Sequence, residues 1–270
     1  MIANILSIAG SDPSGGAGIQ ADIKAISANG GYAMAAITGL TAQNTRGVRR
    51  VALVEPGMVR DQIAALRDDI RIDAVKIGML GSAAIVETVA AALDGLDVPL
   101  VLDPVMVAKG GDRLLERDAV AALRDMLVSR ATVVTPNLPE AADLLAVAEA
   151  TTVEEVAAQA EALAALGAGS VLLKGGHLGG PESPDLLLSS GTAHWIGGPR
   201  HPTRNTHGTG CTLSSALAAW LGRGASLPEA ARRAKDYVSA AIADSDALSV
   251  GAGHGPLHHF ADIASEETRT

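Results

Sequence analysis

Short apolar runs alternate along the chain with longer segments in which apolar residues recur every three or four positions. A short run of this kind is typical of a buried strand, and the longer pattern is typical of an amphipathic helix. Alternation of the two predicts right-handed βαβ crossovers and a mostly parallel sheet with helices on both faces. The expected strands are 5–9, 33–37, 51–54, 74–77, 100–102, 132–134 and 171–173, and the expected helices are 19–28, 58–68, 83–93, 119–127 and 153–166.

The last third of the chain departs from this alternation. Two apolar runs, 186–188 and 192–196, flank a Ser-Ser-Gly turn and predict an antiparallel hairpin. Helices are expected at 212–221 and 228–244. With neither a tandem repeat nor a low-complexity linker in the sequence, we expect one domain over residues 1–270. Ligands of parallel sheets bind beyond the carboxyl ends of the strands, so the chemistry is expected at that edge.

Composition narrows the class of protein. Hydrophobic residues make up 48% of the chain but aromatic residues only 2%, which favours an aliphatic α/β interior. The formal charge of −9, with lysine and arginine scattered, disfavours a nucleic-acid partner. No apolar run reaches the roughly 20 residues of a membrane helix, and Met1–Ala9 lacks a basic leader. Since Cys211 is the only cysteine, we expect a cytoplasmic protein in a reducing compartment.

A glycine-rich turn, residues 205–212, runs directly into an apolar helix. Gly208 and Gly210 allow close approach of the backbone, and the free N–H groups of the first helical turn stabilise a transferring phosphoryl group. Cys211 stands at this helix start, where the dipole is expected to lower its thiol pKa toward neutrality and make it a general base. The alternative is an ordinary cap formed by Thr209 or Thr212, with Cys211 as a small buried hydrophobe.

Two carboxylates are expected at the same edge of the sheet. Asp103 follows the strand at 100–102, with the glycine pair Gly110-Gly111 beyond it, and Glu140 lies shortly after the strand at 132–134. Mg²⁺ favours few carboxylates together with waters and phosphates, so the joint placement predicts a magnesium site. Taken singly, Asp103 is equally explained as a turn residue and Glu140 as a first-turn helix carboxylate.

Three further segments follow strands. Lys174 could meet nucleotide phosphates as a point charge, or it could be a solvated strand end. The glycine-rich segment 9–18 lacks the P-loop pattern, so we interpret it as backbone against which an uncharged substrate lies. Gln43, in the segment 41–45 that follows a predicted strand, can make a bidentate contact with an aminopyrimidine, as glutamine does with adenine. A surface-loop glutamine is the plainer alternative.

The histidines near the C-terminus suggest a metal site at first sight. His254 and His258 have four-residue spacing, and His259 is adjacent. Gly255-Pro256 interrupts any helix between them, so we expect a structural role.

Several motifs together resemble one family. Segments 9–22, 76–80, 135–141, 174–177 and 207–212 are similar to those of the hydroxymethylpyrimidine/phosphomethylpyrimidine kinases of thiamine biosynthesis, and the resemblance covers nearly the whole chain. It implies a ribokinase-like three-layer α/β/α sandwich, ATP as donor, Mg²⁺, and a homodimer. It also implies two successive phosphorylations, first of the hydroxymethyl alcohol and then of the monophosphate.

The resemblance also implies roles for individual residues. Sugar kinases of the wider superfamily generally have an aspartate in place of Cys211, so the cysteine narrows the substrate class. The closest rival is a pyridoxal or pyridoxine kinase of the same architecture. A sensor without turnover is disfavoured, because the candidate catalytic residues are all present. The implied residues are Gln43, Gly10, Met79 and Val105 for the pyrimidine; Lys174, Thr209 and Asn137 for the nucleotide; Asp103 and Glu140 for the metal; and Cys211 with Gly208 and Gly210 for catalysis.

Overall fold

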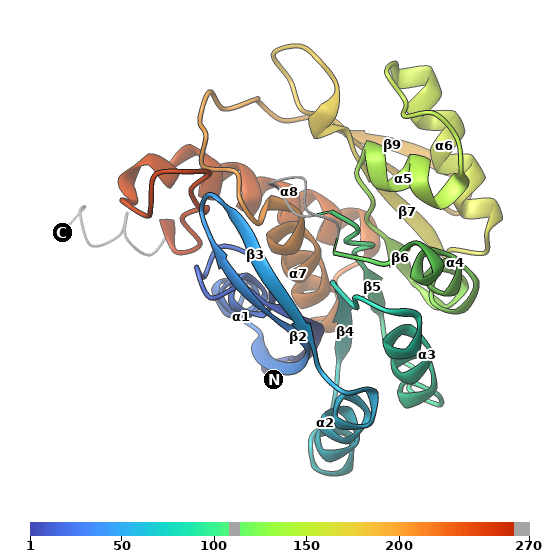
Figure 1. The fold of residues 1–270 in the computed structure, drawn as a ribbon. Coiled ribbons are helices and arrows are strands. Elements are labelled where there is room, and N and C mark those ends of the chain that lie inside the picture. The colour runs from blue at the N-terminus through green and yellow to red at the C-terminus, as the bar shows by residue number, and fades with distance from the viewer. Residues whose placement is uncertain (108–113, 262–270) are drawn as a thin grey trace.

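The computed structural model describes residues 1–107 and 114–261, and within these ranges nine strands form one sheet. The strands are β1 (Asn4–Ser11), β2 (Tyr32–Asn44), β3 (Gly47–Leu53), β4 (Ala74–Ile77), β5 (Leu100–Leu102), β6 (Val133–Val134), β7 (Ser170–Lys174), β8 (Asp185–Ser189) and β9 (Thr192–Ile196). Their spatial order is β3-β2-β1-β4-β5-β6-β7-β8-β9 (Figure 1). The six strands from β2 to β7 in this order are parallel, and β3, β8 and β9 pair antiparallel.

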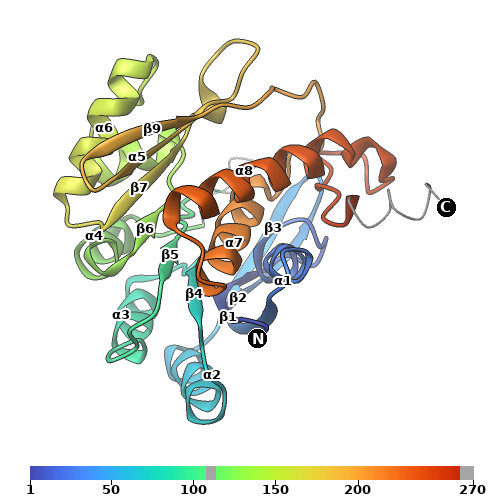
Figure 2. The ribbon, with the colours of Figure 1, turned by 180° about the vertical axis from the view of Figure 1, so that it is seen from behind.

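Helices cover both faces of this sheet, as Figures 1 and 2 show from opposite sides. One layer holds α1, α7 and α8, and the other holds α2 to α6. This arrangement confirms the expected three-layer α/β/α sandwich. The helices are α1 (Gly18–Ala28), α2 (Pro56–Asp69), α3 (Ala83–Ala92), α4 (Arg117–Met126), α5 (Leu138–Leu145), α6 (Val153–Ala165), α7 (Thr209–Gly222) and α8 (Leu227–Ala243).

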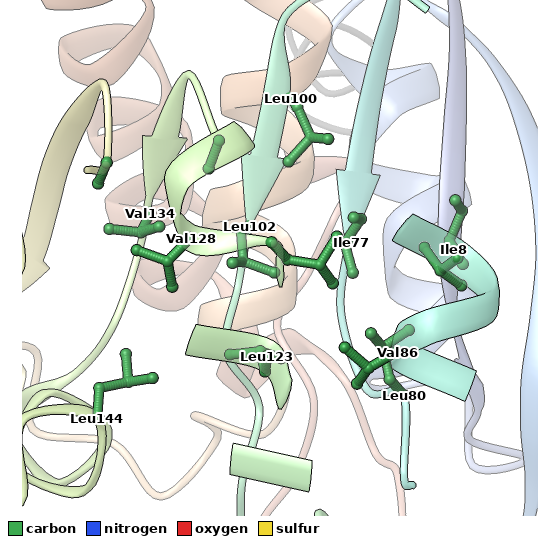
Figure 3. Close-up of a cluster of buried hydrophobic side chains, with 14 of the residues drawn as sticks. Ile8, Ile77, Leu80, Val86, Leu100, Leu102, Leu123, Val128, Val134 and Leu144 are labelled. Carbon is green, nitrogen blue, oxygen red and sulfur yellow. The ribbon is translucent and has the colours of Figure 1, made fainter. Parts of the chain in front are cut away.

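The apolar strands are buried on both faces because alternate side chains point to opposite layers. Ile5 packs in the cluster formed with α1, α7 and α8, whereas its neighbour Leu6 packs in the other cluster. Figure 3 shows part of that second cluster, where aliphatic side chains from neighbouring strands meet those of the covering helices. Its labelled members include Ile8, Ile77, Leu102, Val134, Val86 and Leu123.

The helices begin in different ways, and the start of α7 matters for the site. The helices α5 and α6 each begin with a capping box, formed by Asn137 with Glu140 and by Thr152 with Glu155. The start of α7 has Gly208 as its N-cap and no side-chain cap. The first turn of α7 therefore presents backbone N–H groups that no capping side chain covers.

The predicted elements are confirmed, with two differences. Strand β2 continues to Asn44, so the surface-loop alternative for Gln43 is wrong: residues 41–44 pair with β3. The eight-residue helix α5 was not among the predicted helices. Among the residues with described structure, no helix has the length and apolar character needed to cross a bilayer.

Candidate active site

A cavity of about 770 Å³ opens at the carboxyl ends of the parallel strands. Residues that are far apart in the sequence line it, from the end of β1 to the start of α7. Every candidate residue from the sequence lines this one cavity: Gly10, Gln43, Met79, Asp103, Val105, Asn137, Glu140, Lys174, Gly208, Thr209, Gly210 and Cys211. The glycine pair Gly110-Gly111 lies outside the described residues.

One end of the cavity has an apolar wall. A Cβ atom on Gly10 would lie 2.8 Å from the Met79 sulfur, so glycine is what allows the thioether to pack against the end of β1. The backbone of Met79 is held from the other side, where the Thr38 hydroxyl donates a hydrogen bond to the Met79 carbonyl at 2.6 Å. Val105, after β5, lines the same cavity. Gly10, Met79 and Val105 thus form an apolar wall of the cavity.

The amide of Gln43 lies at this end within a polar chain. The Thr41 hydroxyl donates to Gln43 Oε1 at 3.1 Å, and Gln43 Nε2 lies 3.4 Å from His207 Nε2. His207 Nε2 is 2.7 Å from an oxygen of Asp12, which fixes its proton on that nitrogen as a donor to the carboxylate. The amide nitrogen of Gln43 is therefore left with hydrogen-bonding capacity toward the cavity.

Asp12 and His207 are site residues that the sequence reasoning missed. The Asp12 carboxylate also accepts hydrogen bonds from the N–H groups of Ser14 and Ala17, so it organises the segment 12–17. Burial acts to raise the pKa of Asp12, but hydrogen bonds from His207 and Ser14 hold it below its ordinary value. Both residues stand between glycines, Asp12 in the segment 9–18 and His207 in the turn 205–212, and their polar side chains are the sequence signal for this contact.

The turn before α7 is shaped by close backbone contacts. Gly208 has φ of +81°, and a Cβ atom there would lie 1.8 Å from the Gly16 carbonyl oxygen. Only glycine fits this position, which presses the start of α7 against the segment after β1. The Thr209 hydroxyl donates to the Thr206 carbonyl at 2.8 Å and so closes the turn. A Cβ atom on Gly210 would lie 3.1 Å from Lys174 Nζ, which places this backbone beside the lysine.

Lys174 lies between the two predicted carboxylates. Its Nζ is 2.9 Å from Asp103 Oδ1 and 3.6 Å from Glu140 Oε2. Burial acts to lower the pKa of Lys174, but the two carboxylates raise it above its ordinary value. Burial raises the pKa of Glu140 to about 7; Lys174 opposes this shift and Asp103 adds to it. The lysine is therefore charged, and the second carboxylate is poorly stabilised by one cation alone.

Asp103 and Glu140 offer the carboxylate oxygens that Mg²⁺ prefers as protein ligands. Among the residues that the structure describes, no three His, Cys, Asp or Glu side chains are grouped so that they could hold a metal ion. Two carboxylates on either side of Lys174 match the few protein ligands that Mg²⁺ takes when phosphates and waters complete its shell. Asn137 is less free than expected, because its side-chain oxygen accepts the N–H of Glu140 at 2.9 Å.

The Cys211 thiol is half-buried at the start of α7. Burial raises its pKa to about 11, although the charge of Lys76 and a hydrogen bond from the Gly18 N–H act in the opposite direction. The predicted pKa near neutrality is therefore wrong, since desolvation of the thiolate outweighs the helix N-terminus. The group expected to act as a base rests as a thiol.

The C-terminal histidines lie outside this chemistry. His259 is buried, its Nε2 is 3.0 Å from the Thr212 hydroxyl, and its carbonyl accepts a hydrogen bond from Tyr237. Burial lowers the pKa of His259 to about 4, so it is neutral at physiological pH. It joins α7, α8 and the C-terminal segment in a packing role.

Comparison with known proteins identifies relatives over almost the full length. The family model described as phosphomethylpyrimidine kinase matches residues 12–258. The hydroxymethylpyrimidine/phosphomethylpyrimidine kinase of Escherichia coli (strain K12) is 50% identical over 95% of this chain and 97% of its own. The protein of the same name from Rhizobium meliloti (strain 1021) is 52% identical over 96% of this chain and 98% of its own.

Solved structures include both vitamin kinases. The ADP complex of pyridoxal kinase from Bacillus subtilis superimposes with a TM-score of 0.90 at 37% identity, over 97% of this chain and 99% of that one. Phosphomethylpyrimidine kinase from Clostridium difficile 630 gives a TM-score of 0.79 at 39% identity, over 89% of this chain and 99% of the other.

Proposed function

This chain belongs to the phosphomethylpyrimidine kinase family, and from that premise we propose that it carries out two successive phosphoryl transfers from ATP. The first acceptor is the hydroxymethyl group of 4-amino-5-hydroxymethyl-2-methylpyrimidine, and the second is the resulting monophosphate. The observation that supports this most is that one cavity contains three features. These are an amide beside an apolar wall, a thiol at a helix N-terminus, and a lysine between two carboxylates.

Gln43 is proposed to recognise the aminopyrimidine. Its Oε1 accepts one hydrogen bond from Thr41 and keeps a second lone pair for the exocyclic amino group of the substrate. Its Nε2 can donate to the adjacent ring nitrogen, which completes a bidentate contact. Gly10, Met79 and Val105 would hold the two faces of the ring by apolar contact. The hydroxymethyl group would then point toward Cys211.

The nucleotide is proposed to lie at the other end of the cavity. Lys174, Thr209 and Asn137 would contact its phosphates, with the backbone N–H groups around Gly208 and Gly210 stabilising the charge that develops on the transferring group. Magnesium would neutralise part of the phosphate charge, and Asp103 and Glu140 are the residues to hold it, directly or through water.

In the first step the Cys211 thiolate accepts the proton of the alcohol as its oxygen attacks the γ-phosphorus. The new O–P bond forms while the bond to the β-phosphate oxygen breaks, and ADP leaves with that electron pair. The proton remains on sulfur and then passes to solvent. In the second step the nucleophile is a phosphate oxygen whose second pKa is near 6, so it arrives largely deprotonated and needs the base less.

Pyridoxal kinase is the second candidate function. The Bacillus subtilis pyridoxal kinase superimposes closely, and pyridoxal also presents a hydroxymethyl group on a six-membered nitrogen ring. Gln43 favours the pyrimidine, because an amide matches a ring nitrogen beside an amino group better than it matches a phenolic oxygen.

The deciding experiment is ATP consumption with each vitamin precursor separately, with products identified by mass. We expect the pyrimidine monophosphate to appear first and the diphosphate to follow. Phosphorylation of pyridoxal alone would overturn the proposal. If the monophosphate accumulates and no diphosphate forms, the proposed second phosphorylation is contradicted.

Assembly and location are also proposals. We expect a homodimer, as the resemblance implies, and action in the cytoplasm, where the partly exposed thiol of Cys211 stays reduced.

A further inference from the structure

A charged pair is fully buried beneath the proposed active site. Lys76, on β4, has its side chain completely covered, and its Nζ lies 2.9 Å from both carboxylate oxygens of Asp22 on α1. The hydroxyls of Ser7 and Ser215 also donate to Asp22, at 2.6 and 2.8 Å. Buried ion pairs are seldom more stabilising than apolar residues of the same volume. The pair therefore calls for a role other than stability.

The helices α1 and α7 align this pair with Cys211. Gly18 and Asp22 are four residues apart on α1, and Cys211 and Ser215 are four residues apart on α7, so each two share a helix face. Ser215 contacts Asp22, and one turn nearer the cavity the Gly18 N–H donates to the Cys211 sulfur. Cys211 thus lies one helical turn above the buried carboxylate.

Lys76 reaches this level from the sheet. It lines the same cavity as Cys211, and a Cβ atom on Gly78 would lie only 2.7 Å from its Nζ, so the strand end leaves room for the ammonium. We propose that Lys76 is a positioning residue for Cys211: its ammonium, held in place by Asp22, stabilises the thiolate that accepts the proton of the substrate alcohol. This rests on the proposed function, in which Cys211 is the base.

Charges from several elements act on this thiol. Lys76 on β4 favours the thiolate, whereas Asp22 on α1 and Asp103 after β5 disfavour it. Lys174 on β7 also interacts with Cys211, and its ammonium pairs with Asp103 at 2.9 Å. The Gly18 N–H and the N-terminus of α7 add to the effect of Lys76. Among these charges Lys76 has the largest effect in favour of the thiolate, and its partner Asp22 opposes part of that effect.

Cys211 is the only cysteine, so alkylation of the whole protein with iodoacetamide reports on this thiol without interference. At a pH below the thiol pKa, the alkylation rate is proportional to the thiolate fraction. A thiol pKa that is higher by one therefore slows alkylation about tenfold. We expect Lys76→Met to slow alkylation at pH 8 by about tenfold or more, and Asp22→Asn to accelerate it. Lys24→Met is the matched control, because Lys24 lies on α1 and donates to the Gly15 carbonyl. In this variant Cys211 should be alkylated at the same rate as in the parent.

The two variants should change the alkylation rate in opposite directions. This distinguishes an electrostatic effect from loss of structure, because loss of structure would expose the thiol and speed alkylation in both variants. A folded Lys76→Met protein with the parental alkylation rate would overturn the inference. If that variant does not fold, an unchanged rate in Asp22→Asn would overturn it equally. Failure of the proposed function is a different result: Cys211→Ala would keep full turnover of the alcohol, while the alkylation rates of the other variants would still shift.

Discussion

The role of Cys211 can be tested at the level of the single residue, because the two steps present different nucleophiles. Cys211→Ala should lower kcat for the alcohol by about 10²–10⁴, the usual contribution of a positioned base, and affect the monophosphate much less. The pH dependence has a definite sign. Since the pKa of Cys211 is raised to about 11, the thiolate fraction and the first-step rate should rise with pH, by about tenfold per unit between pH 7 and 9.

Separate turnover of the alcohol and the monophosphate across pH provides the measurement. Above pH 7 the second step should be nearly flat, because its nucleophile is already ionised. Equal losses in the two steps would contradict a proton-transfer role and would indicate that Cys211 acts through geometry or charge.

The sequence indicated which residues line the site more readily than it indicated their distances, burial and pKa values. Asp103 and Glu140 come after strands and Lys174 is the last residue of one, so their convergence follows from a parallel sheet. Their pairing distances and the burial that raises the pKa of Glu140 depend on side chains from several elements, which no local pattern encodes. The contact between Asp12 and His207 spans 195 positions and was invisible for the same reason.

At the level of elements, the predicted end of a strand was wrong where tertiary contacts determine how far the strand extends. The second half of β2 alternates exposed and partly covered residues, because only β3 pairs with it beyond Leu40. No apolar run marks such a strand, and residues 41–44 therefore look like a loop. The helix α5 was predictable in principle, since Asn137-Leu-Pro-Glu140 is a capping-box sequence with proline in the first turn.

Two capping boxes allow a matched comparison of α5 with α6. Asn137→Ala and Thr152→Ala each remove the side-chain cap of a helix, and each should cost about 1 kcal/mol of unfolding free energy. Only α5 carries Glu140 at the cavity, so only Asn137→Ala should also weaken ATP binding, by about fivefold if the same 1 kcal/mol is lost there.

Denaturant unfolding and the KM for ATP measure the two effects separately. A Thr152→Ala protein with an equally raised KM would show that general destabilisation, and not the cap at Glu140, is responsible.

For the whole molecule, the sheet topology explains why distant motifs form one site. Parallel strands end at one edge, so segments from Gly10 to Lys174 arrive there without any local signal between them. The packing of α7 then depends on Gly208, whose close contact with Gly16 holds the start of this helix against the segment after β1. The fold class follows from alternation alone, whereas the depth and chemistry of the cavity follow from these close contacts.

The hairpin of β2 and β3 is where we expect the homodimer to form. Beyond Leu40 it has two strands only, and a two-stranded ribbon is marginal without a partner. Leu40 is 53% exposed and pairs in register with Ala52, which is also exposed, so these two residues form an uncovered apolar patch on one face of the hairpin, next to Ala42 and Arg50. A second copy of this face would cover it, and the unpaired edge of β3 adds a further site for association.

Light scattering after gel filtration should therefore give twice the mass of one chain. Leu40→Asp should shift the protein toward the monomer, because it places a charge in the apolar contact. Val153→Asp is the control: Val153 is 46% exposed at the first position of α6, where a carboxylate is favoured, and its mass should stay that of the parent. A parent protein that elutes as a monomer at micromolar concentration would contradict the dimer, whereas a dimer that Leu40→Asp leaves intact would move the interface to another face.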